Sequence, residues 1–121
     1  MDQLTNTKKL LSDIGMPEQQ QSDLCALTLL ALCDIKDHET FSDASNKWIR
    51  IHDIIQFVNT NYASNYAENS RETFRKQAMH HFRNAALIED NGLATNSPNY
   101  RYRLTPKFLA VLKKIGKRGY N

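Results

Sequence analysis

A basic helical segment followed by two short alternating runs, between residues 69 and 103, constrains the fold more than any other part of the chain. In the segment NSRETFRKQAMHHFRNAA, Phe74, Ala78, Phe82 and Ala85 recur on one face of a helix, and basic side chains occupy the other face. The run LIED then precedes an Asn-Gly pair, which favours a tight turn, and the run YRYRL follows. This order predicts a helix that leads into a β-hairpin.

Elements elsewhere in the chain are predicted from apolar spacing and from residues that begin or end helices. Gly15 and Pro17 end a first helix, and Asn69 with Glu72 has the spacing of a capping box. Thr105, followed by proline, opens the last helix. The predicted helices span residues 3–14, 18–33, 52–61, 69–86 and 105–116, and the predicted short strands span 48–51, 87–89 and 100–104.

The predicted core centres on the second helix. Its residues 24–33 are apolar nearly all round, which is typical of a helix buried at the centre of a domain. The polar, acidic stretch 34–47 is predicted to be a loop. The helix at 52–61 is expected to bury Ile54, Ile55 and Val58. The last helix is expected to bury Phe108, Leu109, Val111, Leu112 and Ile115, and to stop at Gly116.

This element order predicts a mainly α fold, a winged helix-turn-helix with a small β-hairpin wing and extra N- and C-terminal helices. Residues 18–33 would be the scaffold, 52–61 the positioning helix, about 69–86 the recognition helix and about 87–104 the wing. Residues 1–17 would form an N-terminal helical extension, and 18–121 the winged helix-turn-helix domain as a single globular unit.

Charge is divided unevenly between the two halves of the chain. Residues 1–66 contain 5 Lys/Arg against 9 Asp/Glu, whereas residues 67–121 contain 11 against 4. A basic half indicates a nucleic-acid partner, because cations that neutralise phosphates supply salt-dependent affinity. We expect the cationic side chains beyond residue 70 to gather on one surface that fits a groove of duplex DNA.

The expected DNA-binding residues divide by role. Base edges are read by polar side chains on the exposed, N-terminal part of a recognition helix, and phosphates by cations at its flanks. In the wing, arginines that alternate with tyrosines share one face of a strand. The candidates are Ser70, Thr73, Lys76, Gln77 and His80 toward bases, Arg71, Arg75 and Arg83 toward phosphates, and Arg101 and Arg103 in the wing.

Several of these side chains have an alternative structural role. Arg71 falls near the apolar side of the helix, where pairing with an acidic residue is the alternative to a DNA contact. His81 faces the core side and is expected to be structural, whereas His80 is the better contact candidate. Tyr100 and Tyr102 are either core residues or stacking platforms.

No motif for catalysis is present. The sequence lacks G-x-S-x-G, G-x-x-x-x-G-K-[ST] and H-E-x-x-H. Cys25 and Cys33 are expected to be reduced, buried thiols, and no metal site is expected, since His80 and His81 are adjacent and one helix cannot aim both at one ion. With no apolar run near ~18 residues and no signal peptide, a cytoplasmic protein is expected, with no membrane partner.

The sequence also resembles a known family. The segments Ala26-Leu-Thr-Leu-Leu-Ala-Leu, Asn69-Ser-Arg-Glu-Thr-Phe-Arg-Lys-Gln and Asn96-Ser-Pro, with His81-Phe82 and Ala86-Leu87, are similar to the N-terminal helix-turn-helix region of type II restriction endonucleases of the BsuBI/PstI family. The resemblance covers most of residues 18–115. It makes Arg71, Thr73, Arg75 and Gln77 the leading interface candidates, with Glu72 as a helix cap.

The resemblance implies more than the residues alone show. Such enzymes cut duplex DNA at short palindromic sites with Mg²⁺, typically as homodimers, through a separate C-terminal nuclease domain of the PD-(D/E)xK type. This chain has no cleavage site of its own on that reading, and Mg²⁺ is expected only for the absent nuclease domain. It would be an excised specificity domain or a stand-alone relative. Two other functions remain open, a stand-alone winged-helix transcriptional regulator and a winged-helix protein-interaction module.

Overall fold

A computed structural model describes residues 2–118 of the chain. The first helix, α1 (Gln3–Asp13), begins at Asp2, whose carboxylate accepts a hydrogen bond from the backbone N–H of Thr5 at 2.7 Å. It ends as predicted before Gly15, whose φ of 91° is in the left-handed region that glycine adopts without strain. Leu10 and Leu11 of this helix are buried in the common core.

The second helix is shorter than predicted. Residues 18–33 form two elements, the 3₁₀ turn η1 (Glu18–Gln21) and the helix α2 (Asp23–Cys33). The break occurs because Ser22 is extended and its hydroxyl caps α2, accepting from the backbone N–H of Cys25 at 3.2 Å. Every residue from Cys25 to Cys33 is buried, so α2 is the central helix, as predicted.

The acidic loop at 34–47 is present but contains one ordered turn, η2 (Phe41–Asp43). Phe41 is fully buried there. The predicted strand at 48–51 is reduced to one residue: Ile49 forms an isolated antiparallel bridge with Tyr102, with hydrogen bonds of 2.8 and 2.9 Å. A longer strand does not form because Arg50 already caps the next helix, α3 (Ile51–Asn61).

The predicted recognition helix is a continuous helical segment with an irregular middle. It comprises the 3₁₀ turn η3 (Glu68–Ser70), α4 (Arg71–Phe74), the π-helical turn η4 (Arg75–Met79) and α5 (His80–Asn84). The capping box predicted at Asn69 is wrong, because the chain is already turning at residues 68–70 and the N-cap position falls on Ser70, without a side-chain cap.

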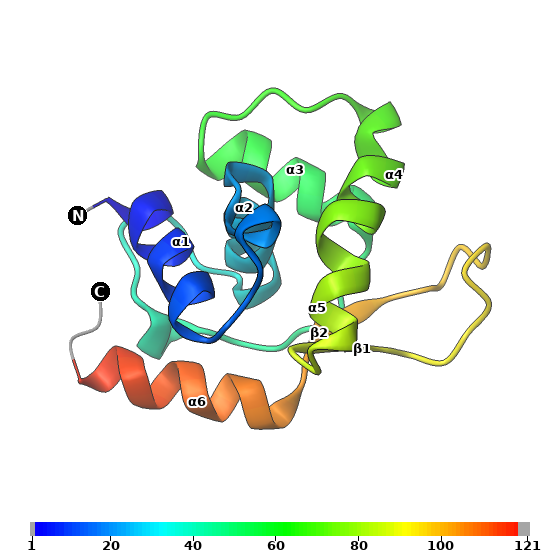
Figure 1. Ribbon diagram of the computed structural model, residues 1–121. Coiled ribbons are helices and arrows are strands. Elements are labelled where there is room, and N and C mark those ends of the chain that lie inside the picture. The colour runs from blue at the N-terminus through cyan, green and yellow to red at the C-terminus, as the bar shows by residue number, and fades with distance from the viewer. Residues whose placement is uncertain (1, 119–121) are drawn as a thin grey trace.

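The hairpin consists of β1 (Ile88–Asp90) and β2 (Tyr102–Leu104), an antiparallel pair in which Ile88 faces Leu104 and Asp90 faces Tyr102. Both strands are shorter than predicted, and residues 91–101 between them form an extended loop. Gly92 has a φ of 78°, so the predicted need for a positive φ after Asn91 is confirmed. In Figure 1 this loop projects from the body of the molecule.

The last helix, α6 (Pro106–Lys117), begins as predicted, with the Thr105 hydroxyl accepting from the N–H of Phe108 at 3.2 Å. The predicted stop at Gly116 is wrong, because Gly116 lies inside the helix and packs against the backbone of Phe41 and Ser42. Val111 is 42% exposed, and Leu109 and Ile115 are only half-buried. The apolar face of α6 is therefore narrower than predicted, with Phe108 and Leu112 at its centre.

Together these elements make the predicted fold class, a winged helix-turn-helix with additional terminal helices. Figure 1 shows α1, α3 and the recognition segment around α2, with α6 along the lower edge beneath them. The two-stranded sheet lies at the base of α5, so the loop after β1 projects beside the recognition segment. Among the described residues, no helix is long and apolar enough to cross a membrane.

Gly116→Ala is expected to destabilise the protein. Helix propensity alone favours alanine by about 1 kcal/mol. However, a Cβ at residue 116 would lie 2.2 Å from the backbone nitrogen of Ser42, so α6 would have to move away from η2. Overpacking of this kind costs about 1–3 kcal/mol. Urea unfolding should show a net loss for Gly116→Ala and a change within about 0.5 kcal/mol for the exposed control Lys114→Ala. A gain in stability would contradict the close packing.

Candidate nucleic-acid interface

The recognition segment, residues 71–84, presents the predicted side chains to solvent. Its inner face buries Phe74, Ala78, Met79 and Phe82. The predicted contact residues within this segment are all exposed: Arg71, Thr73, Arg75, Lys76, Gln77, His80 and Arg83. Ser70, which directly precedes the segment, is half-buried. Exposure is what a contact to a base edge or a phosphate requires, but it does not identify the contacts.

The π-helical turn at 75–79 has a specific support from the core. The carbonyl oxygen of Gln77 accepts hydrogen bonds from the Gln20 side-chain amide at 3.3 Å and from the Cys25 thiol at 3.2 Å. Burial raises the pKa of Cys25, which keeps its thiol protonated and able to donate. The π-helical turn therefore has hydrogen-bond donors on η1 and α2 for one of its carbonyl groups. Lys76 and Gln77 in this turn are exposed.

Most predicted cationic contacts already have a carboxylate partner within the protein. Arg71 pairs with Glu68 at 2.9 Å, so an acidic partner is present for Arg71, as its alternative role requires. The remaining pairs are Arg75 with Glu72, Lys76 with Glu72 at 3.9 Å, Arg83 with Asp90 at 2.9 Å and Arg103 with Glu89 at 2.7 Å. The Asp90 side chain is only 10% exposed, but the other side chains of these pairs are 31–72% exposed. The pairs without Asp90 therefore contribute at most about 1 kcal/mol each and can open at low cost.

Glu72 is a partner of these cations and not a helix cap. Its carboxylate accepts from Nε of Arg75 at 3.0 Å and also binds the Nη2 of the same guanidinium. These hydrogen bonds lower the pKa of Glu72. The cap inferred from the resemblance is therefore wrong, because α4 has no side-chain cap and Glu72 points along the exposed surface toward Arg75.

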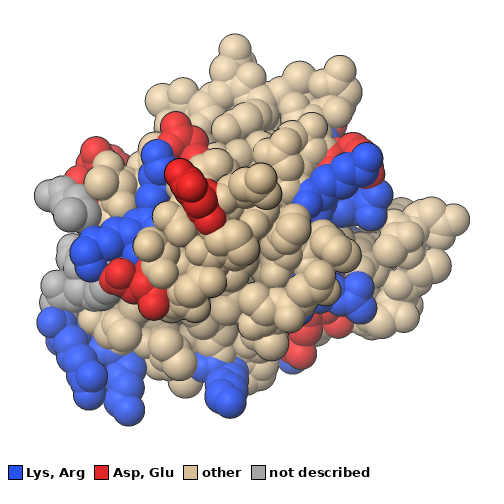
Figure 2. All heavy atoms as spheres, in the orientation of Figure 1, with Lys and Arg blue, Asp and Glu red and all other residues tan. Residues whose placement is uncertain are grey.

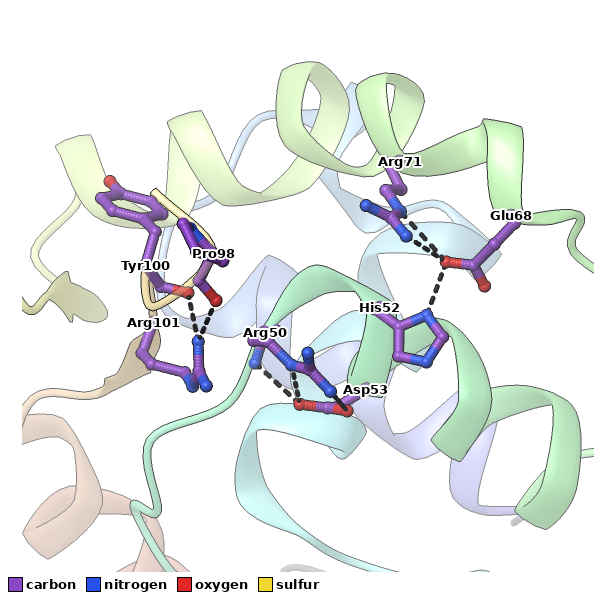
Figure 3. Close-up of polar contacts among 8 residues, drawn as sticks. All are labelled: Arg50, His52, Asp53, Glu68, Arg71, Pro98, Tyr100 and Arg101. Carbon is purple, nitrogen blue, oxygen red and sulfur yellow. Dashed lines mark hydrogen bonds and ion pairs between the residues drawn. The ribbon is translucent and has the colours of Figure 1, made fainter. Parts of the chain in front are cut away.

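A cleft of about 470 Å³ lies between the start of α3, the start of the recognition segment and the wing loop. Its walls include Arg50 from the start of α3, Arg71 and Arg75 from the recognition segment, and Tyr100 from the wing side. Figure 3 shows Arg71 and His52 both directed at Glu68, with Arg50 held against Asp53 nearby.

Two residues of this cleft, Arg50 and His52, were not predicted from the sequence. Arg50 precedes α3, and Nε and Nη2 of its guanidinium donate to the Asp53 carboxylate at 3.1 Å each. His52 Nδ1 lies 2.6 Å from Glu68 Oε1, so one carboxylate joins the start of α3 to Arg71. Neither residue stands near the recognition helix in the sequence, and only the packing of α3 beside α4 brings them to it.

The wing arginines lie together on one side of the hairpin. Arg101 and Arg103 line a shallow cleft with Trp48. The two arginines therefore lie on one face of the strand, as predicted. The Arg103 guanidinium lies 4.3 Å from the centre of the exposed Trp48 ring, and Arg101 donates to the carbonyl oxygen of Pro98 at 3.0 Å and to that of Tyr100 at 3.2 Å. Tyr102 is buried, so it is a core residue.

Positive charge is not gathered on one surface. Residues 67–104 contain 6 Lys/Arg against 4 Asp/Glu, whereas residues 105–118 contain 5 against none. Figure 2 shows basic groups on the recognition segment close to acidic ones, and a separate basic group over α6 along the lower edge. The expectation of a single cationic surface is wrong. The basic residues at 105–118, which have no acidic residue among them, lie on and directly after α6, away from α4.

The two histidines of the recognition segment differ as predicted in exposure. His80 is exposed and lies 3.3 Å from Asn84 through Nε2, whereas His81 is half-buried. Their rings are tilted edge to face, 5.5 Å apart. Within residues 2–118, no three His, Cys, Asp or Glu side chains are grouped closely enough to hold a metal ion.

Known proteins are similar to this chain in sequence and in fold. A family model described as the BsuBI/PstI restriction endonuclease HTH domain matches residues 1–121. The chain is 37% identical over 109 residues to the type II restriction enzyme BsuBI of Bacillus subtilis, covering 87% of this chain and 34% of that protein. It is 28% identical over 120 residues to the type II restriction enzyme AplI of Arthrospira platensis, covering 97% and 37%.

A solved structure of the SdaI restriction endonuclease superposes with a TM-score of 0.87 at 26% identity, covering 93% of this chain and 37% of that one. The chain therefore spans little more than a third of the length of the proteins that it matches.

Asp53→Asn is expected to weaken α3 in a pH-dependent way. The Arg50 side chain lowers the pKa of Asp53 from its ordinary value of 3.8. The ionised carboxylate therefore stabilises the fold at pH values above 3.8, and this contribution is lost as pH falls through the lowered pKa. Unfolding in urea should show a loss of about 1 kcal/mol or less at pH 7 and a smaller loss at pH 3, below the ordinary pKa of the carboxyl group. The exposed control Glu18→Gln should change little at either pH. An equal loss at both pH values would rule out the charge pairing as the cause.

Proposed function

The chain belongs to the BsuBI/PstI restriction endonuclease HTH domain family, and on this premise we propose that it is the module that selects the DNA site of a type II restriction endonuclease. The observation that carries the proposal is the outer face of residues 71–84, an exposed row of polar and basic side chains on a helix that is rigidly packed below and flanked by a wing. A helix of this kind enters the major groove of B-DNA, which is wide enough to admit it.

The side chains divide between reading and positioning. Gln77 lies at the middle of the exposed face, and its amide can form two hydrogen bonds with adenine; Lys76 beside it can donate to guanine O6 and N7. Arg75, Arg71 and Arg83 bind phosphates, with Thr73, Ser70 and His80 close to the groove floor. In the wing, Arg101 and Arg103 track the backbone or the minor groove beside the helix.

The proposed partner is a short palindromic duplex site bound by two copies of the protein. A two-fold symmetric site presents the same half-site to each protomer, which fits a homodimer. Cleavage, with Mg²⁺, would be performed by a part of the protein other than residues 1–121, since the relatives are about three times as long as this chain. The proposed place of action is the cytoplasm, where a bacterial restriction enzyme meets incoming DNA.

Duplex binding by this chain should depend steeply on salt. If the recognition segment and wing contact several phosphates, a plot of log affinity against log salt concentration should have a slope steeper than about −3, at roughly −0.9 per phosphate neutralised. The double variant Arg75→Ala/Lys76→Ala should flatten the slope by about one to two units. The matched control Lys114→Ala/Lys117→Ala removes the same charge from α6 and should have a smaller effect. A slope near zero for the wild-type chain would rule out DNA binding through phosphates.

Base preference should depend on Gln77 more than on its cationic neighbours. Selection of bound duplexes from a random pool gives the preferred site, and Gln77→Ala should lose discrimination at one base pair by about 1–3 kcal/mol. Arg83→Ala should weaken binding to all duplexes by a similar factor, because a phosphate contact carries no base identity. Unchanged selection by Gln77→Ala would exclude Gln77 as a reader.

A further inference from the structure

The three arginines that line the cleft between α3, α4 and the wing loop share one arrangement. Each guanidinium is bound by a carboxylate three residues away along the chain. Arg50 binds Asp53 and precedes it, Arg75 binds Glu72 and follows it, and Arg71 binds Glu68. The three positive charges that would attract a phosphate are therefore matched by three negative charges held at the same place.

The carboxylates occupy the guanidinium edges that an anion from outside would use. Glu72 meets Arg75 through both of its oxygens, at Nε and Nη2, which is the two-point geometry that arginine also forms with phosphate. Glu68 receives Nε and Nη2 of Arg71 on one oxygen, at 3.0 and 2.9 Å. Figure 3 shows Glu68 between Arg71 and His52, with both side chains directed at its carboxylate.

These carboxylates differ in how firmly they are held. Asp53 also accepts a hydrogen bond from the backbone N–H of Arg50 at 3.2 Å, so it is part of the start of α3. Glu68 and Glu72 contact only side chains in the described residues, and each is close to half exposed, at 43% and 54%. Exposed pairs of this kind exchange partners at low cost, so a phosphate can displace Glu68 or Glu72 more easily than Asp53.

We propose that this cleft binds a backbone phosphate of duplex DNA through Arg50, His52, Arg71 and Arg75. Glu72, which lines the cleft, and Glu68, which binds His52 and Arg71 beside it, pair with these cations until DNA displaces them. The proposal rests on the proposed function and deepens it. On this proposal, Glu68 and Glu72 increase sequence specificity although neither side chain contacts a base. They lower the attraction of the cleft for any duplex, so that only a duplex whose bases also make contacts with the recognition segment binds tightly.

The physical reason is that phosphates are common to all sequences. A cleft of three unpaired arginines would bind every duplex, and this sequence-independent term would reduce the ratio of specific to non-specific affinity. With the carboxylates in place, each phosphate contact must be exchanged for an internal ion pair, and the net gain is small. The base contacts then decide which duplex is bound, above all those of an uncharged reader such as Gln77, which exchanges no internal ion pair.

Glu72→Gln tests the proposal with little risk to the fold, since Glu72 pairs only with side chains on its own helix in the described residues. Affinity for a random-sequence duplex should rise about two- to fivefold, the salt dependence should steepen by up to about one unit, and affinity for the selected duplex should rise less. The control Asp37→Asn removes the same charge from an exposed loop residue that does not line the cleft, and should change neither affinity.

Glu68→Gln should also raise the affinity for a random-sequence duplex. The double variant Glu68→Gln/Arg71→Ala should not show this rise, because the guanidinium that the first change frees is then absent. Inorganic phosphate at matched ionic strength should displace duplex no better than chloride; strong displacement would mean a site for small anions and would overturn the assignment to a DNA backbone. Unchanged affinity in Glu72→Gln, or a changed base preference at one position, would also overturn it. Failure of the wild-type chain to bind any duplex would instead refute the proposed function.

Discussion

The packing of the recognition segment on α2 is the contact on which the rest of the structure depends. Phe74, Ala78, Met79 and Phe82 are buried on one side, and this fixes which side chains face outward. The Gln77 carbonyl, bound by Cys25 and Gln20, holds the π-helical turn in the middle of the segment. A buried thiol and a buried amide thereby determine where an exposed helix places its polar side chains, and the wing is built on the end of the same segment.

Many cationic side chains of this protein have a carboxylate partner inside the protein, and the proposed DNA phosphates would have to compete with it. The arginines beside the recognition segment are paired with carboxylates, whereas the lysines of α6 have no carboxylate partner within residues 2–118. Net charge therefore does not locate the proposed DNA surface. The site proposed here depends on cations whose partners can be exchanged, and the proposal predicts a modest affinity, with sequence selected by side chains such as Gln77.

Local patterns were sufficient for much of the fold. The end of α1 before Gly15, the burial of α2, the cap at Thr105 and the positive φ at Gly92 all depend on residues next to one another, and all were predicted. One failure lies where a distant segment intervenes. Gly116 continues α6 because its missing Cβ lets the helix lie on η2, and no neighbour of Gly116 in the sequence contains that information.

The sequence by itself determined the order of elements, the winged helix class and the exposed face of residues 71–84, because apolar spacing and capping residues act within a few positions of the chain. Tertiary structure decided which charges meet. Arg50 and His52 reach Arg71 only because α3 packs beside α4, and the Gln77 carbonyl in the π-helical turn has its hydrogen-bond donors on η1 and α2. Side chains separated by 19 or more residues meet through packing, which the spacing of residues along a single helix does not encode.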